Sequence, residues 1–268
     1  MRIGIHLRTM GPQSTRATIL ECARAAEDAG LDDLWVGDHI AIPPDDAEGS
    51  GGRYLDPLAT LAFLAGTTKR IGIGTSVLVV PYRPPLATAK WVATIQELSE
   101  GRLHLGVGSG WMRAEFRAAG VEWQRRGAIT DATLEFLQRC FANEVIESNG
   151  QPFLFKPRPK RPPIFVGGAP PHALRRTVRF GDGWMPHAAD PQSLKPSIDE
   201  LNQQMADAGR GKAEVAVLTT LPFADPSRVE ELVHAFRDVG ATRLIHGWRY
   251  RDAAEFVEVV NKMASIAA

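Results

Sequence analysis

The chain has 268 residues, of which 44% are hydrophobic and 23% are charged, a composition typical of a globular protein. Basic and acidic residues both number 31, so the net charge is zero and the excess positive charge of a nucleic-acid-binding protein is missing. There are only two cysteines, we recognise no secretory leader, and no apolar segment approaches the roughly 20 residues that cross a bilayer. We therefore expect a cytoplasmic protein that binds neither nucleic acid nor membranes.

Short apolar segments alternate with amphipathic segments from one end of the chain to the other. In chain order, the segments expected to be strands are residues 3–7, 34–37, 71–80, 103–107, 164–166, 183–185, 215–219 and 243–246. Helical spacing of apolar residues occurs in segments 15–29, 57–68, 85–98, 112–119, 130–141, 172–180, 193–208, 229–239 and 256–263. Eight strand–helix units with strands apolar on both faces predict a closed parallel barrel. The expected fold class is α/β, a single (β/α)8 TIM-barrel domain over residues 1–268.

Functional side chains of such a barrel lie at the carboxyl ends of its strands. His39 follows the second strand, and a histidine there can act as an acid or a base near neutral pH. It can equally well cap the strand or bind its neighbour Asp38, and both interpretations stay open. Ser76 and Val77 lie in the third strand, where small residues give way to bulky ones. Either a bulge carries backbone into the site there, or the small residues only pack inside the barrel.

Two glycine-containing loops follow the fourth and fifth strands, and each precedes a helix. Such loops let backbone N–H groups approach an anion at the start of a helix, or they only form a tight turn. The first loop does not match the dinucleotide fingerprint, because Trp111 stands where the third glycine belongs. Two loops of this kind in one barrel favour a phosphorylated cofactor. Their residues are Gly108, Ser109 and Gly110 in the first and Gly167, Gly168 and Ala169 in the second.

Other chemistries lack the residues that they need. The sequence has no His-Glu-x-x-His motif and no His-x-His on its first strand, so no metal site is expected. It has no Gly-x-Ser-x-Gly elbow to carry a serine nucleophile, and neither cysteine lies at a strand end, where a thiol nucleophile would be expected. A phosphate-binding isomerase or aldolase would need a lysine or glutamate at a strand end, and none is well placed. The interpretation that remains is an enzyme built around the histidine and the two glycine loops.

At these same residues the sequence resembles the bacterial luciferase-like monooxygenase superfamily. It is most similar to the branch of oxidoreductases that use the deazaflavin coenzyme F-420. The matching strings occur in the order of the family and cover most of residues 1–190. They are AEDAGLDDLWVGDH, IGIGTSVLVVPYRPP, ELSEGRLHLGVGSGWMRAEF, RRGAITDATLEFL, PPIFVGG and RFGDGW. Beyond Pro191 the resemblance is mostly one of architecture.

The resemblance implies a role for each matching position. His39 corresponds to a histidine beside the deazaflavin ring, which serves as a base in sugar-phosphate members of the family. The Ser76–Val77 pair corresponds to a non-proline cis peptide bond that supports the ring from behind. The two glycine loops correspond to segments that meet the phosphate side of the cofactor. In the second of them, Gly167, Gly168 and Ala169 offer backbone N–H groups to the phosphate.

Ser109 also bears on the choice of cofactor. Flavin-using luciferases have a phosphate-binding arginine at this place, so the small residue is similar to the deazaflavin branch. The resemblance then implies hydride transfer between coenzyme F-420 and a small organic substrate, with His39 exchanging a proton with the substrate oxygen. Two alternatives remain. One is an FMN-dependent monooxygenase that uses reduced flavin and oxygen, and the other is a non-catalytic barrel that only binds the cofactor.

The sequence says less about the surroundings of the site. The loop over residues 42–56 is the expected lid, and it carries no recognisable code for a substrate. The basic residues of segment 155–163 either attract the acidic tail of the coenzyme or form a solvated loop. A homodimer is expected by analogy with the family, through helices near the second and third strands, with Leu61 and Phe63 as exposed candidates.

Overall fold

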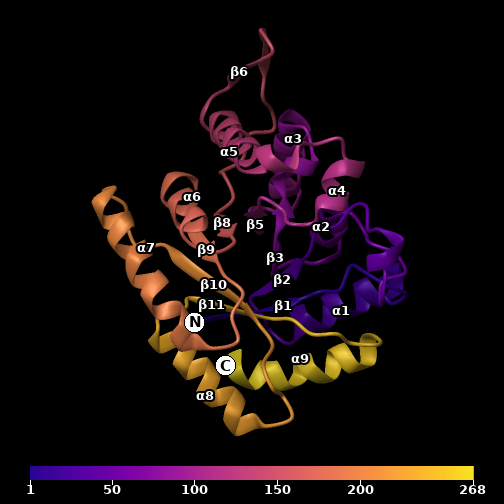
Figure 1. Ribbon diagram of the computed structural model, residues 1–268. Coiled ribbons are helices and arrows are strands. Elements are labelled where there is room, and N and C mark those ends of the chain that lie inside the picture. Colours follow the sequence, from indigo (N-terminus) through magenta and orange to yellow (C-terminus); the bar gives the residue numbers. More distant parts are fainter. Residues whose placement is uncertain (268) are drawn as a thin grey trace.

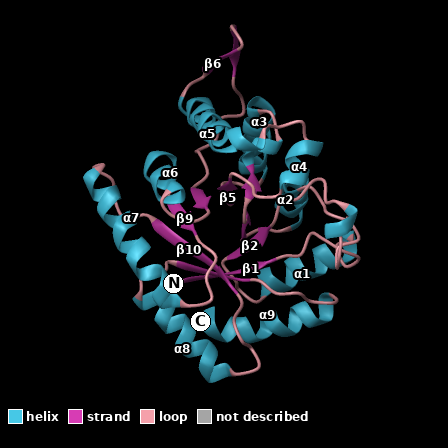
Figure 2. Ribbon diagram, in the orientation of Figure 1, coloured by secondary structure: helices cyan, strands magenta, loops and turns pink. Residues whose placement is uncertain are grey.

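Parallel strands form a closed barrel that is wrapped by helices, as the computed structural model shows in Figures 1 and 2. The structure describes residues 1–267. The barrel strands are Arg2–His6 (β1), Asp33–Val36 (β2), Gly72–Thr75 (β3), Leu78–Val79 (β4), Leu103–Gly108 (β5), Ile164–Gly167 (β8), Gly183–Met185 (β9), Glu214–Thr219 (β10) and Arg243–His246 (β11). Their order is β3-β2-β1-β11-β10-β9-β8-β5-β4, and a pairing of β3 with β5 closes the ring. The expected TIM-barrel fold is confirmed.

Helices connect successive strands and cover the outside of the barrel (Figure 2). They are Arg16–Asp28 (α1), Pro57–Thr67 (α2), Pro85–Leu98 (α3), Arg113–Ala118 (α4), Arg126–Ala142 (α5), His172–Phe180 (α6), Lys195–Asp207 (α7), Pro226–Asp238 (α8) and Ala253–Ala267 (α9). Side chains of Thr15, Asp56 and Asp225 cap α1, α2 and α8 by accepting hydrogen bonds from free amides of the first turn. Across residues 1–267, no helix is long and apolar enough to span a membrane.

The third strand differs from the expectation of one continuous segment over residues 71–80. It is divided into β3 and β4 by Ser76 and Val77, which are joined by a non-proline cis peptide bond. The Ser76 amide donates to the carbonyl of Val36 at 2.8 Å, so the break lies against the end of β2. Ser76 and Val77 line the cavity at the mouth of the barrel, so the break carries backbone into the site. The residues before it, Gly74 and Thr75, pack inside the barrel as the alternative interpretation held.

A hairpin that the sequence analysis did not predict projects from the barrel between α5 and β8 (Figure 1). Its strands, Val145–Ser148 (β6) and Gln151–Leu154 (β7), pair antiparallel. The turn is made by Asn149 and Gly150, with φ of 50° and 75°. Asn-Gly is the commonest sequence for a two-residue hairpin turn, because both positions need positive φ. The signal was therefore present in the sequence.

The inside of the barrel beneath its mouth is filled by a buried polar cluster. Arg243 is fully buried, forms an ion pair with Asp33, and lies between the rings of Trp35 and Phe165, with its guanidinium carbon 5.7 and 5.5 Å from their centroids. His104 Nε2 lies 2.9 Å from Asp33 Oδ1, and burial lowers the pKa of this imidazole to about 4. Because these side chains occupy the interior, only the carboxyl ends of the strands are open to a ligand.

One surface expectation needs correction, and an alternative that the sequence left open can be decided. Leu61 is fully buried against the core, so it is not an exposed residue available to a second subunit, and Phe63 is half-buried. The basic segment precedes β8 and therefore lies at the amino end of that strand, away from the mouth. In it Lys156 pairs with Glu144, and Arg161 pairs with Asp182. The geometry favours a solvated loop over a binding site for an acidic tail.

Candidate active site

A cavity of 870 Å³ opens at the carboxyl ends of the strands. Its size lies within the range of about 300–1,000 Å³ that is usual for small-molecule sites. A second cavity, of 470 Å³, adjoins it and shares residues 76–77 and 167–170. All the residues that the sequence singled out line the larger cavity: His39, Ser76, Val77, Gly108, Ser109, Gly110, Gly167, Gly168 and Ala169. Four strand ends that are far apart in the sequence thus meet at one place.

His39 is held by a carboxylate that the sequence analysis did not single out. Its Nδ1 lies 2.9 Å from Oε2 of Glu115, which belongs to α4. The carboxylate of its neighbour Asp38 instead forms a bidentate ion pair with the guanidinium of Arg83, at 2.6 and 2.9 Å. The interpretation of His39 as a partner of Asp38 is therefore wrong. Since Nδ1 is engaged by Glu115, Nε2 is the nitrogen that can act on a ligand in the cavity.

Glu115 is itself fixed by several donors. Its Oε1 accepts hydrogen bonds from the amides of Ile40 and Ala41 at 2.6 and 3.0 Å, and its Oε2 also accepts one from the Tyr82 hydroxyl at 2.9 Å. Burial alone would raise the pKa of Glu115. The hydrogen bonds from His39, Ala41 and Ile40 outweigh that effect and hold this pKa at about 2. An ionised carboxylate therefore binds Nδ1 of the imidazole and fixes the orientation of the ring.

Val77 stands between the two glycine loops. A Cβ atom added to Gly108 would lie 2.6 Å from one methyl of Val77, and a Cβ added to Gly167 would lie 2.7 Å from the other. Only glycine at both positions leaves room for this side chain. Gly110 has φ of +77°, and a Cβ there would lie 2.6 Å from Val79. The glycines thus let the bulge of the third strand form the wall of the cavity.

Two arginines line the side of the cavity next to the glycine loops. Arg176 of α6 is only 12% exposed and pairs with Asp131 at 2.6 Å, while Arg126 stacks on Trp123 with its guanidinium carbon 3.5 Å from the ring centroid. The loop of residues 167–169 leads into the amino end of α6. Guanidinium groups beside a helix amino end make this part of the cavity suited to an anion such as a phosphate. Neither arginine was predicted from the sequence.

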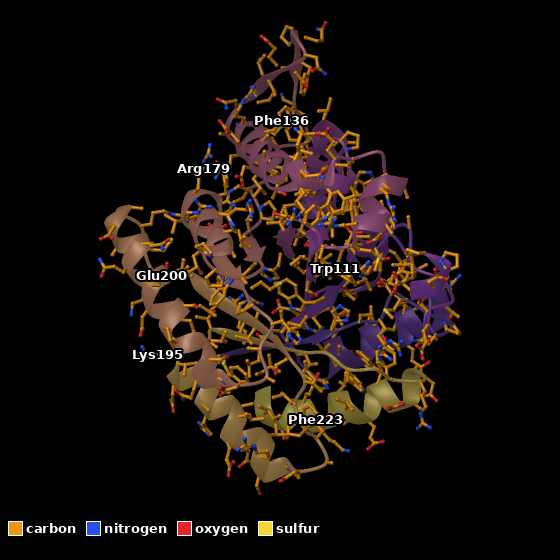
Figure 3. All side chains as sticks on the ribbon, viewed as in Figure 1. Trp111, Phe136, Arg179, Lys195, Glu200 and Phe223 are labelled. Atoms are coloured by element: carbon orange, nitrogen blue, oxygen red, sulfur yellow. The ribbon has the colours of Figure 1, made fainter. Side chains whose placement is uncertain are left out.

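Aromatic side chains form the outer rim of the cavity around His39. Tyr54 lies 5.1 Å and Trp111 lies 6.2 Å from the imidazole, measured between ring centroids. Trp111 is 69% exposed, and Figure 3 shows it toward the middle of the molecule, whereas Arg179, Lys195 and Glu200 lie on outer helices. Tyr54 comes from the loop that the sequence indicated as a lid. The rim therefore offers ring faces at the entrance to the cavity.

His6 ends β1 and lines the inner part of the same cavity. Burial, and then the nearby charge of Arg8, lower the pKa of this imidazole to about 4. A histidine with this pKa is neutral at physiological pH, so His6 contributes a polar group without a charge. Within residues 1–267 no three His, Cys, Asp or Glu side chains cluster as a metal ion would require.

Several solved structures share this fold, and two of them are complexes with a cofactor or a cofactor adduct. One is an F-420-dependent secondary alcohol dehydrogenase in complex with an F-420–acetone adduct, with a TM-score of 0.79, 18% identity, and coverage of 100% of this chain and 99% of that chain. The other is the oxygenating constituent of 3,6-diketocamphane monooxygenase from Pseudomonas putida, in complex with FMN. Its TM-score is 0.81 at 15% identity, with coverage of 100% of this chain and 98% of that chain.

Sequence comparison gives the family. Among curated relatives, an uncharacterized protein of Mycobacterium tuberculosis is 29% identical over an alignment of 246 positions that covers 85% of this chain and 83% of that protein. The family model described as luciferase-like monooxygenase matches residues 1–265. That match runs through every strand of the barrel and both glycine loops. The chain belongs to the luciferase-like monooxygenase family.

Proposed function

We propose that the chain is an oxidoreductase that transfers a hydride between coenzyme F-420 and a small organic substrate at the mouth of the barrel. The observation that carries the proposal is the pairing of His39 with the ionised Glu115 in the cavity that also holds Val77 and both glycine loops. An acid–base group, a backbone wall and an anion-binding loop are the three parts that such a reaction needs.

The residues present fit a cofactor that has a flat ring and a phosphate. Val77 and Gly108 offer a wall without bulky polar groups, against which a ring can lie. The amides of Gly168 and Ala169, with the guanidinium of Arg176, are the candidate ligands of the phosphate. When bound, a deazaflavin supplies hydride transfer and forms no useful peroxide with oxygen.

In this proposal His39 exchanges a proton with the oxygen of the substrate through Nε2. Glu115 accepts the hydrogen bond of Nδ1, holds the ring in one orientation and stabilises its positive charge after it takes up a proton. Glu115 touches His39 and not the reacting atoms, so it is a positioning residue. Tyr54 and Trp111 at the rim help to exclude water from the cavity.

The second candidate is a monooxygenase that uses reduced FMN and oxygen. Arg126 and Arg176 favour it, because the terminal phosphate of FMN is a dianion that arginine binds well. Ser109 favours the deazaflavin, because it stands where flavin-using luciferases have a phosphate-binding arginine. The small side chain of Ser109 lies 3.3 Å from the Thr130 hydroxyl and leaves the loop uncharged.

A titration of the purified protein with oxidised F-420 and, separately, with oxidised FMN tests the proposal. We expect the fluorescence of the deazaflavin to report binding with a Kd on the order of micromolar, and FMN to bind at least tenfold more weakly. The reverse preference would favour the monooxygenase and call for an assay of oxygen consumption. Binding without turnover over a broad panel of substrates would indicate a non-catalytic barrel, and binding of neither cofactor would contradict the proposal.

The same titration of an Arg176→Met variant tests whether Arg176 binds the phosphate of the cofactor. We expect Kd for the phosphate-bearing cofactor to rise on the order of tenfold, because one charge-assisted hydrogen bond is lost. Binding of the phosphate-free chromophore should not change. The matched control is Arg179→Met on the same helix, where the side chain is 60% exposed and pairs with Glu135 outside the cavity. Equal effects of the two substitutions would exclude Arg176 from the phosphate site.

A further inference from the structure

The loop between β2 and α2 carries two residues of the candidate active site, one close to each of its ends. His39 follows Asp38 at the start of the loop, and Tyr54 stands two residues before Asp56, which caps α2. The rings of His39 and Tyr54 lie 5.1 Å apart, between centroids, and both line the cavity. The placement of the two loop ends therefore sets where the imidazole and its aromatic neighbour lie.

One guanidinium joins the two ends of this loop. Arg83 donates from Nη1 and Nη2 to the two carboxylate oxygens of Asp38 at 2.6 and 2.9 Å, and from Nη2 also to Oδ2 of Asp56 at 2.7 Å. The planar fork of arginine makes these bonds in one fixed geometry, which the single ammonium of lysine does not reproduce. The Arg83 side chain is only 15% exposed and that of Asp38 is fully buried. Solvent therefore screens this part of the bridge only weakly.

Each carboxylate of the bridge also fixes a second element. Oδ2 of Asp38 accepts a hydrogen bond from the Val79 amide of β4 at 2.8 Å. Oδ1 of Asp56 accepts from two amides in the first turn of α2, at 2.9 and 3.0 Å. Burial would raise the pKa of Asp56, but the hydrogen bonds from Arg83 and from α2 hold it below its ordinary value. The bridge thus joins the ends of β2, β4 and α2 at the mouth of the barrel.

The middle of the loop is held differently from its ends. Near its second end the loop pairs with the segment after β1, since the Leu55 amide donates to the Thr9 carbonyl at 2.8 Å. For residues 42–52, in contrast, every hydrogen bond that the structure gives within the described chain has its partner inside segment 43–53. Residues 42–52 are thus able to move as a lid without displacing His39, provided that the two ends stay joined.

We infer that Arg83 is a positioning residue of the active site, which clamps the two ends of the loop so that His39 and Tyr54 keep their places when residues 42–52 move. Among residues 1–267, those that line the cavity do not include Arg83, so it acts only through the two carboxylates that it binds. The inference rests on the proposed function for the role of His39. The clamp itself is a property of the cofactor-free protein and is tested there.

Hydrogen exchange of the cofactor-free full chain, followed by mass spectrometry, tests the clamp. Arg83→Lys keeps a positive charge beside Asp38 and loses the fork that also reaches Asp56. We expect the peptides that contain the Val79 and Leu55 amides to exchange at least tenfold faster than in the wild type, while peptides from β10 and β11 keep their rates. Unchanged exchange at both places, or an equal increase over the whole barrel, would overturn the inference.

Asp56→Asn removes the bond to Arg83 without removing the cap of α2, and it also serves if Arg83→Lys does not fold. Asparagine caps a helix about as well as aspartate, but its amide nitrogen cannot accept the hydrogen bond from Arg83. We expect exchange at Leu55 to be at least threefold faster, with little change at Val79. The matched control is Asp225→Asn, which changes the cap of α8 in the same way and should leave both amides at wild-type rates. Equal exchange at Leu55 in the two asparagine variants would overturn the inference.

Kinetic measurements connect the clamp to the reaction. With a substrate found in a broad panel, Arg83→Lys should lower kcat per folded molecule on the order of tenfold, because the imidazole loses its alignment. Kd for the cofactor should stay within about threefold. An unchanged kcat per folded molecule would mean a structural role only and would overturn the inference.

The same measurements separate this inference from the proposed function. A protein that binds the cofactor, but whose loop ends do not loosen in Arg83→Lys, keeps the proposed function and loses the inference. A protein whose loop ends loosen in Arg83→Lys, but that binds neither cofactor, keeps the clamp and loses the proposed function.

Discussion

Replacing His39 with alanine lowers kcat on the order of 10²-fold or more, because a positioned acid–base group contributes about 10² to 10⁴ to such a reaction. In the proposed reaction, the substitution removes the nitrogen that would exchange a proton with the substrate oxygen, and it leaves the wall at Val77 and both glycine loops in place. Kd for the cofactor should therefore stay within about threefold. Steady-state kinetics with a substrate found in a broad panel, together with a fluorescence titration of the cofactor, measure both quantities.

The control for this substitution is His234→Ala, which removes the same side chain from an exposed position on α8. It should leave both kcat and Kd unchanged. An unchanged kcat in the His39 variant would remove this residue from the mechanism. A large loss of cofactor binding with kcat intact would instead make His39 a cofactor ligand only.

Replacing Glu115 with alanine destabilises the protein by about 3–5 kcal/mol, the usual result of removing one partner from a buried charged network. The Tyr82 hydroxyl and the amides of Ile40 and Ala41 lose their acceptor, and His39 loses its counter-charge. Glu115→Gln keeps an acceptor oxygen, so it should lose less. Urea unfolding followed by circular dichroism measures the free energy of unfolding. A loss below about 1 kcal/mol in the alanine variant would contradict the network.

The pH dependence of the free energy of unfolding gives a second measure of how much the Glu115 carboxylate stabilises the fold. Its pKa is about 2 in the folded chain and near the ordinary value of 4.5 in the unfolded chain, so the unfolded state binds the proton more readily. The carboxylate therefore stabilises the fold fully above pH 4.5, and this contribution disappears as the pH falls through 2. It amounts to about 3 kcal/mol. In Glu115→Gln this part of the acid destabilisation should be missing.

A positioning role for Glu115 also has a kinetic signature. Glu115→Gln keeps an acceptor oxygen that can hold Nδ1 of His39, so its kcat should exceed that of Glu115→Ala. A purely structural role would lower the amount of folded enzyme and leave kcat per folded molecule equal in the two variants. Comparison of kcat at equal concentrations of folded protein distinguishes the roles.

Local patterns in the sequence were enough to predict the barrel. Strand and helix periodicities, the glycines at strand ends and the caps such as Asp56 all act over a few residues, and they recur eight times. The rule that ligands meet the carboxyl ends of strands then brought His39, Ser76 and the two glycine loops to one cavity. Asn149 and Gly150 carry an equally local signal for the hairpin, because both have the positive φ that a two-residue turn needs.

Partners of the site residues depended on contacts that no local pattern encodes. Glu115 binds His39, which lies 76 residues away in the sequence. Asp38 pairs with Arg83, which lies 45 residues away. Both choices depend on where α4 and the segment after β4 pack against the mouth. Arg176 also reaches the site through packing. The sequence shows that its helix is amphipathic, but only the packed structure shows that Arg176 is the arginine of α6 that lines the cavity.

The sequence by itself thus determined the class of fold, the family and the strand ends whose residues meet at one cavity, because these follow from short-range periodicity and short motifs. Only the tertiary structure decided which carboxylate binds His39, how the third strand breaks at Ser76, and that a second cavity adjoins the first at Val77. Those features arise where loops from different strands meet. Their geometry is set by the closure of the barrel, which joins residues that the sequence keeps far apart.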